Sequence, residues 1–175
     1  MIISLIGFMG TGKSSVGKYL AKKLDFLFID TDSEIELEMG ITIADIFQEY
    51  GEEYFREIEE KVLENILQSV DNAVLSTGGG IVLSSKNRAI LREKSLPIVL
   101  QASVDEIYNR VKDDYQRPLL DVPEPKEVIE KLLNQRKDCY NSFKIKIYTN
   151  DKSIEEISDL IINNFIREEG ESLDE

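Results

Sequence analysis

Apolar residues along the chain gather in five short runs, separated by amphipathic stretches. The runs are almost continuously apolar, which is typical of strands buried on both faces of a parallel sheet. Strands that alternate with helices form such a sheet, with helices on both of its sides. We therefore predict an α/β fold with strands at Ile2–Ile6, Phe26–Ile29, Ala73–Leu75, Pro97–Leu100 and Ile145–Tyr148.

Helical patterns fill most of the chain between these runs. The stretch 35–69 has helical patterns and no strand pattern, so we expect a helical insertion between the second and third strands. The complete set of predicted helices is Ser15–Leu24, Ser33–Glu38, Thr42–Glu49, Glu53–Ser69, Ser85–Glu93, Val104–Val111, Pro125–Phe143 and Ile154–Ile166.

The segment from Gly7 to Ser14 carries the clearest chemical motif. Its sequence, G-F-M-G-T-G-K-S, matches G-x-x-x-x-G-K-[ST] between a predicted strand and a predicted helix. Glycines let backbone N–H groups close around an anion, and a helix N-terminus adds partial positive charge. In such a loop the lysine reaches the β- and γ-phosphates, and the following hydroxyl binds Mg²⁺. We therefore predict a P-loop, with Lys13 on the phosphates and Ser14 on the metal.

Two carboxylates, Asp30 and Asp32, follow the second predicted strand. Residues two apart on an extended strand face the same side, so both are expected to point to one site. Asp30 would join the Mg²⁺ shell, and Asp32 would accept a proton from an acceptor hydroxyl. The alternative is that Asp32 or Ser33 caps the next helix, since Ser33 and Glu36 have the spacing of a capping box. Beside a P-loop we favour the functional interpretation.

Three glycines, Gly78, Gly79 and Gly80, follow the third predicted strand. Such a run indicates close approach to the backbone, either by a ligand or because the chain turns sharply into the next helix. In open α/β sheets ligands bind beyond the carboxyl ends of the strands, and this position favours ligand contact.

Arginines are the remaining candidates for binding anions. Arg56 and Arg136 lie in predicted helices, where the simplest role is a surface ion pair, for Arg56 with Glu52 or Glu60. The irregular polar stretch 112–124 has the length of a functional loop, and we predict that it is a lid. Arg110 and Arg117 lie beside it and within it, so that they can clamp phosphates when it closes.

Composition narrows the functional classes. The 175 residues carry a formal net charge of −13, from 34 acidic and 21 basic residues, so we expect no binding to nucleic acid or anionic membranes. The chain has no histidine, which excludes catalytic triads and metal sites that depend on histidine. Its single cysteine, Cys139, allows no intrachain disulfide. Because the first strand pattern begins at once after Met1, we expect no signal peptide and a cytoplasmic enzyme.

Together these segments resemble the shikimate kinase family over about residues 1–150. The P-loop occurs in many enzymes, whereas the other motifs in one chain are far more specific. The matching motifs, in the family's order, are G-F-M-G-T-G-K-S, D-T-D at 30–32, I-A-D-I-F, E-Y-F-R-E-I-E, S-T-G-G-G, R-P-L-L at 117–120 and R-K-D-C-Y at 136–140.

The resemblance implies transfer of the ATP γ-phosphate to the 3-hydroxyl of shikimate, in aromatic amino-acid biosynthesis. It also implies a three-layer P-loop fold of the nucleoside-monophosphate-kinase type, with a five-stranded parallel sheet in the order 2-3-1-4-5. We expect a monomeric kinase domain over residues 1–168, with a substrate-binding insertion at about 33–61 and the lid at about 112–124. An acidic, frayed tail is expected at 169–175.

Roles for individual residues follow from the same resemblance. Those implied for ATP are Gly10, Thr11, Gly12, Lys13, Ser14 and Ser15 on the phosphates, Arg110 near the adenine and Arg117 closing over the phosphates. Those implied for shikimate are Asp32, Arg56, Gly78, Gly79, Gly80 and Arg136. Ser14 and, through water, Asp30 would hold Mg²⁺, and Glu59 would orient Arg56. The implied catalytic residues are Lys13, Asp32 and Arg117.

Three rival functions stay open at this point. A gluconate kinase on the same fold would also bind a carboxylate through arginines, although R-P-L-L and F-R-x-x-E favour shikimate. A nucleotide-dependent switch would have no need of the D-T-D and G-G-G motifs. A nucleoside-monophosphate kinase would need a base-reading pocket within 35–69, where the sequence gives no clear sign of one.

Overall fold

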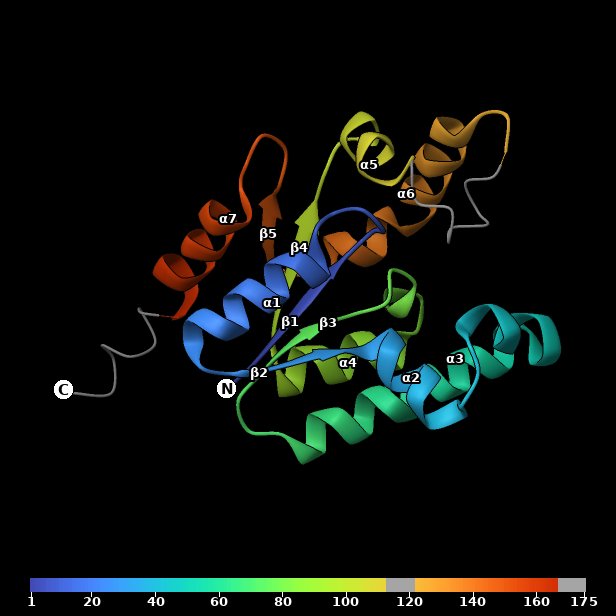
Figure 1. Ribbon diagram of the computed structural model, residues 1–175, viewed down its shortest axis with the longest axis horizontal. Helices are drawn as coiled ribbons and strands as arrows, with labels where there is room; N and C mark the ends of the chain where they lie inside the picture. The colour runs from blue at the N-terminus through green and yellow to red at the C-terminus, as the bar shows by residue number, and fades with distance from the viewer. Residues whose placement is uncertain (113–121, 167–175) are drawn as a thin grey trace.

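The computed structural model describes residues 1–112 and 122–166. Within these residues a five-stranded parallel sheet forms the centre of the molecule, in the order β2-β3-β1-β4-β5 (Figure 1). This order confirms the one expected from the resemblance. The strands are β1 (Ile2–Gly7), β2 (Leu27–Asp30), β3 (Ala73–Ser76), β4 (Leu96–Gln101) and β5 (Ile145–Tyr148).

Strand β1 is the central strand and is buried along its whole length. It pairs with β3 on one side and β4 on the other, so the loop that follows it emerges in the middle of the sheet edge. Ser4, a polar residue in this strand, is fully buried, and its hydroxyl donates a hydrogen bond to Ser95 Oγ at 2.8 Å. Burial on both faces explains why the strand sequence does not alternate between apolar and polar residues.

Helices cover both faces of the sheet, as predicted. One layer contains α1 (Lys13–Leu24) and α7 (Ile154–Ile161), whose apolar side chains pack with Ile3, Leu5 and Ile147. The opposite layer contains α3 (Ile43–Ser69), α4 (Ser85–Lys94) and the C-terminal part of α6 (Pro125–Asn141). Residues Ile162–Ile166, predicted as the end of the last helix, form a wider π-helical turn, η3.

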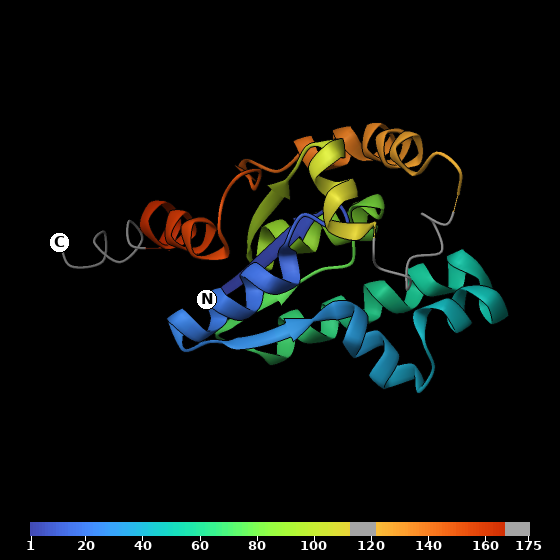
Figure 2. The same cartoon turned by 45° about the horizontal axis from the view of Figure 1, so that its top comes forward.

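The helical insertion consists of α2 (Thr31–Met39) and α3. The two helices predicted at 42–69 form α3, which is interrupted at Gly51, where φ is 84°. A left-handed residue breaks helical geometry, and glycine adopts that conformation without steric cost. Figures 1 and 2 show the insertion and α6 extending to the same side of the molecule.

Short elements complete the described chain. The helix α5 (Val104–Val111) begins as predicted, and a 3₁₀ turn, η1 (Ile81–Leu83), follows the glycine run, where no helix was predicted. Residues 113–121 of the predicted lid and the predicted tail at 169–175 lie outside the described residues. Within the described ranges, no helix combines the length and apolar character needed to cross a membrane.

Candidate active site

The P-loop wraps the space between β1 and α1, as its motif predicts. Gly10 and Gly12 have φ values of 74° and 96°, in the left-handed region that glycine tolerates. Helix α1 begins at Lys13, and no side chain among the described residues caps its N-terminus. Its first backbone N–H groups therefore lack a side-chain acceptor at the end of the helix that favours negative charge. This geometry suits a phosphate group.

Two side chains of the loop fold back onto its own backbone. Lys13 is largely buried, and its Nζ donates to the Phe8 carbonyl oxygen at 2.9 Å. Thr11 Oγ1 donates to the same carbonyl at 2.7 Å. The lysine therefore lies inside the loop, close to the place where the motif predicts phosphates.

A group of oxygen atoms lies at the start of α1. Ser14 Oγ donates to Asp30 Oδ2 at 2.9 Å and lies 2.9 Å from Ser76 Oγ. Hydroxyl and carboxylate oxygens are the ligands that Mg²⁺ prefers, usually together with several waters. The donor set thus fits a magnesium ion held through Ser14 and Asp30. Ser76 was not predicted, although its position at the carboxyl end of β3 could have identified it.

The local geometry predicted for Asp30 and Asp32 is wrong. Strand β2 ends at Asp30, and Asp32 lies in the first turn of α2 rather than on an extended strand. Asp30 is the N-cap of α2, and its Oδ1 accepts a hydrogen bond from the Asp32 N–H at 3.2 Å. The proposed cap by Asp32 or Ser33 is therefore also wrong. A carboxylate at the N-cap starts the helix immediately, which turns Asp32 toward the same site by a different route.

The carboxyl of Asp32 lies in an environment that favours its neutral form. Burial raises its pKa from 3.8 to about 6, and the nearby negative charge of Asp30 acts in the same direction. The positive charges of Lys13 and Arg56 oppose this shift. A carboxyl with a pKa in this range can exchange a proton near neutral pH, which is what a general base requires.

The glycine run lies between charged side chains. A Cβ atom on Gly78 would lie 2.5 Å from Asp32 Oδ1 and 3.2 Å from Glu59 Oε1. A Cβ atom on Gly80 would lie 2.5 Å from Arg56 Nη2. The turn is therefore confirmed, and ligand contact at this run stays a prediction. The chain does turn, into η1, and its backbone also admits functional side chains at very short range.

Arg56 forms the ion pair with Glu52 that its spacing allowed, and it also binds a second, buried carboxylate, that of Glu59. Its Nη1 donates to Glu59 Oε2 at 2.8 Å, and its Nη2 donates to Glu52 at 3.1 Å. The Glu59 side chain is only 1% exposed, and the Arg56 side chain is 22% exposed. Burial raises the pKa of Glu59 to about 7, while Arg56 favours its ionised form. Glu59 thus holds the guanidinium in place, as the resemblance implied.

Arg136, which lies on α6, also contacts the glycine run. Its Nη1 donates to the Gly79 carbonyl at 3.0 Å, and its guanidinium carbon lies 5.5 Å from the centre of the Phe8 ring. Tyr140, one turn later on α6, donates to the same carbonyl at 2.8 Å. Tyr140 was not singled out before, although its spacing from Arg136 puts both on one helix face.

Arg110 connects three parts of the nucleotide side. It donates to the Gly10 carbonyl at 3.2 Å and to the Thr149 carbonyl at 2.9 Å, and it pairs with Glu106 at 2.8 Å. It therefore lies beside the P-loop and the segment after β5. Arg117, the other predicted phosphate ligand, lies outside the described residues.

Most of these groups share one hollow, which we call the P-loop cavity. It has a volume of about 410 Å³. Arg56 and Arg136 are not among its lining residues, but they contact the glycine run that forms part of its wall. The lining residues are Met9, Gly10, Gly12, Lys13, Ser14, Ser15, Asp30, Asp32, Ser76, Thr77, Gly79, Arg110 and Val111.

Comparison with known proteins gives a consistent result. A family model described as shikimate kinase matches residues 9–166. A shikimate kinase from Caldanaerobacter subterraneus subsp. tengcongensis is 40% identical over 168 residues, which cover 96% of this chain and 98% of the relative. The solved structure of an Acinetobacter baumannii shikimate kinase in complex with shikimate superposes with a TM-score of 0.86. It is 35% identical and covers 94% of each chain.

One solved structure bears on the rival function. A gluconokinase from Sinorhizobium meliloti has a TM-score of 0.58 and is 17% identical, over 99% of this chain and 97% of its own. At this level of identity the similarity shows a shared fold alone.

Proposed function

Because the chain belongs to the shikimate kinase family, we propose that it transfers the γ-phosphate of ATP to the 3-hydroxyl of shikimate. The products are shikimate 3-phosphate and ADP. The observation that carries this proposal is that the P-loop and Asp32 line one cavity, beside two arginines. A phosphate donor and a hydroxyl acceptor can thus meet in one place.

The nucleotide side would hold the triphosphate mainly through backbone groups. Residues Gly10 to Ser15 bind the phosphates, and Lys13 moves from the Phe8 carbonyl to the β- and γ-phosphates. Ser14 and, through water, Asp30 would hold Mg²⁺, which would neutralise charge on those phosphates. Arg110 lies toward the adenine, beside Thr149.

The acceptor side would hold shikimate by its carboxylate. Arg56 and Arg136 offer guanidinium groups, which can bind a carboxylate with two parallel hydrogen bonds. The backbone of residues 78–80 lines the same pocket. This orientation brings the 3-hydroxyl toward Asp32, whose carboxylate binds the hydroxyls and accepts the proton as transfer proceeds.

Phosphoryl transfer demands alignment and charge neutralisation more than covalent chemistry from the protein. Lys13 supplies positive charge at the γ-phosphate, and we propose that Arg117 adds to it when residues 112–124 close as a lid. Closure would exclude water, which otherwise competes with the acceptor hydroxyl.

The remaining assignments concern the protein in the cell. We propose a monomer that acts in the cytoplasm on a small molecule, without nucleic-acid or membrane partners. The support is the net charge of −13 and the single cysteine.

An acceptor panel tests the function directly. Purified protein with Mg-ATP is supplied with shikimate, quinate, gluconate or AMP, and ADP release is measured. We expect rapid ADP release with shikimate and a rate at least about a hundredfold lower with gluconate and AMP, because a site that hydrogen-bonds one acceptor discriminates strongly. Faster release with gluconate would support the rival kinase, and release that no acceptor stimulates would support a switch.

A further inference from the structure

A second cavity lies on the side of the sheet opposite α1. We call it the α6 cavity, and its volume of about 330 Å³ is within the usual range of about 300–1,000 Å³ for small-molecule sites. One face of α6 forms its roof and the carboxyl ends of β4 and β5 form its floor. Its lining residues are Phe8, Thr11, Val99, Leu100, Gln101, Ala102, Leu133, Asn134, Lys137, Tyr140, Asn141 and Tyr148.

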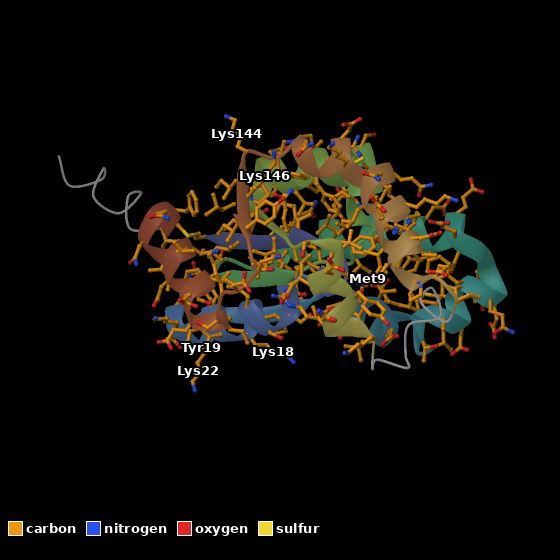
Figure 3. All side chains as sticks on the ribbon, turned by 90° about the horizontal axis from the view of Figure 1, so that it is seen from above. Met9, Lys18, Tyr19, Lys22, Lys144 and Lys146 are labelled. Carbon is orange, nitrogen blue, oxygen red and sulfur yellow. The ribbon has the colours of Figure 1, made fainter. Side chains whose placement is uncertain are left out.

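The cavity exists because β5 is an edge strand that is covered well on one face. Ile145 and Ile147 pack into the apolar cluster with α1 and α7. Alternate residues of a strand face opposite sides, and Lys146 and Tyr148 on the other side are both exposed. Figure 3 shows Lys146 on the side of the sheet opposite Lys18 of α1. Helix α6 packs on α5 and η1, so the end of β5 stays accessible.

The charge of this surface is unusual for the chain. Acidic residues outnumber basic ones by 34 to 21 in the sequence, yet none of the described residues lining the α6 cavity is acidic. Lys137 lines it, and Lys144 and Lys146 lie on the same side of the sheet (Figure 3). A cavity lined by a lysine and by no carboxylate favours a small anion over a neutral or cationic ligand.

The neutral lining residues define the rest of the ligand. Tyr148 is 61% exposed and offers an aromatic surface, and Leu133 adds an apolar side chain to the lining. Asn134 and Asn141 are seven residues, or two turns, apart on α6, so they lie on the same helix face. Their side-chain amides offer hydrogen-bond donors to the cavity that Lys137 also lines. An apolar wall with a few convergent polar groups is the usual composition of a small-molecule site.

We propose that the α6 cavity is a second small-molecule site, which binds a carboxylate attached to a planar apolar body. The carboxylate lies against Lys137 and the asparagine amides, and the planar body lies along Tyr148 and Leu133. The α6 cavity shares no lining residue with the P-loop cavity, and the Arg136 guanidinium bonds the Gly79 carbonyl rather than lining the α6 cavity.

Phenylacetate is a suitable probe, and phenylacetamide is its neutral counterpart. Calorimetry and amide chemical shifts of the full chain, saturated with shikimate and ADP, should show one saturable phenylacetate site. An affinity in the millimolar range is expected for about ten non-hydrogen atoms. Phenylacetamide should bind up to about fivefold more weakly, which is the most that a single exposed ion pair contributes.

Matched variants locate the site. Lys137→Gln should weaken phenylacetate about fivefold, whereas Lys131→Gln, an exposed lysine of the same helix outside this cavity, should leave it unchanged. Tyr148→Ala should weaken both probes. Because these side chains are exposed, the variants are expected to fold, which circular dichroism would verify.

Three outcomes would overturn the proposal. They are absence of saturable binding, displacement of phenylacetate by shikimate or ADP, and equal weakening by the two lysine substitutions. The first would show a solvent-filled groove, the second would assign the probe to the active site, and the third would show a general charge effect. None of these outcomes bears on the kinase reaction itself, which the acceptor panel tests separately.

Discussion

The nucleotide side and the acceptor side of the P-loop cavity are built in contrasting ways. The core of the nucleotide side, the P-loop, comes from eight consecutive residues, Gly7 to Ser14, and it presents mainly backbone N–H groups. The acceptor side comes from α2, α3, the loop after β3, and α6, and it presents charged side chains. Its parts are separated by up to 104 positions in the sequence, from Asp32 to Arg136.

The two sides therefore depend on different physical devices. A backbone cradle needs only the correct φ values and an open helix N-terminus. A cluster of charged side chains needs burial, pairing and room, because an unpaired buried charge is costly. Here Glu59 pairs with Arg56, and the missing side chain of Gly78 gives Asp32 and Glu59 their space. Changes on the acceptor side should accordingly impair the acceptor and leave ATP binding intact.

The substitution Asp32→Asn should give the largest effect. The amide cannot accept the proton from the shikimate hydroxyl, so kcat should fall by at least about a hundredfold, the usual scale for a general base. Steady-state kinetics with both substrates saturating measures this, and calorimetry should show ATP binding changed by less than about threefold. Glu38→Gln, an exposed residue of the same helix, serves as the control and should keep normal turnover. Near-normal kcat in the Asp32 variant would remove Asp32 from the chemistry.

The same contrast explains what sequence patterns could predict. The P-loop and the sheet with its order were predicted correctly, since the motif is local and the family resemblance supplied the order. The extended geometry of Asp30 and Asp32 was wrong, because the pattern did not reveal that Asp30 caps a helix beginning at Thr31. Local residue spacing identifies a P-loop well, but it does not reveal the residue at which a helix begins.

Contacts between residues that are far apart in the sequence were the hardest to predict from residue spacing. The contact of Tyr140 with the Gly79 carbonyl joins residues 61 positions apart, and η1 forms where the glycine run gave no helical pattern. Arg56 alone has the sequence environment of an ordinary surface arginine. Its burial beside Glu59 arises because α3 packs against the sheet, which a single helix pattern does not report.

Gly78→Ala should produce the next largest effect. The new methyl group would lie 2.5 Å from Asp32 Oδ1, so the carboxylate must move away from the acceptor hydroxyl. We expect kcat/KM for shikimate to fall about thirtyfold, equivalent to about 2 kcal/mol of overpacking. The KM for ATP should stay within about twofold. An equal loss for both substrates would mean that the two sides are not independent.

Arg136→Lys should have a smaller effect, confined to the acceptor. An ammonium group keeps the charge but cannot form two parallel bonds with a carboxylate, so the Kd of shikimate should rise about tenfold. Titration of each ligand by calorimetry checks this prediction. Arg92→Lys is a matched control, since Arg92 binds the Ser142 carbonyl and hydroxyl rather than the glycine run. Equal weakening of shikimate and ATP would assign Arg136 another role.

The pH dependence of shikimate binding should give the smallest effect and the finest test. Burial raises the pKa of Asp32 to about 6. The carboxylate that accepts hydrogen bonds from the shikimate hydroxyls therefore becomes neutral as the pH falls through that value. In the absence of nucleotide, affinity at pH 6 should therefore be about half of that at pH 8, and it should fall further at pH 5.

Two variants show whether this midpoint belongs to Asp32. In Asp32→Asn the midpoint near pH 6 should disappear. In Glu36→Gln it should move to lower pH, because the negative charge of Glu36 contributes to the raised pKa of Asp32. A wild-type midpoint near 3.8, the ordinary pKa of an aspartate, would mean that the acceptor side is as open to water as the P-loop surface. The acceptor side would then not be a buried cluster of charges at Asp32, and its contrast with the solvated backbone of the P-loop would not hold there.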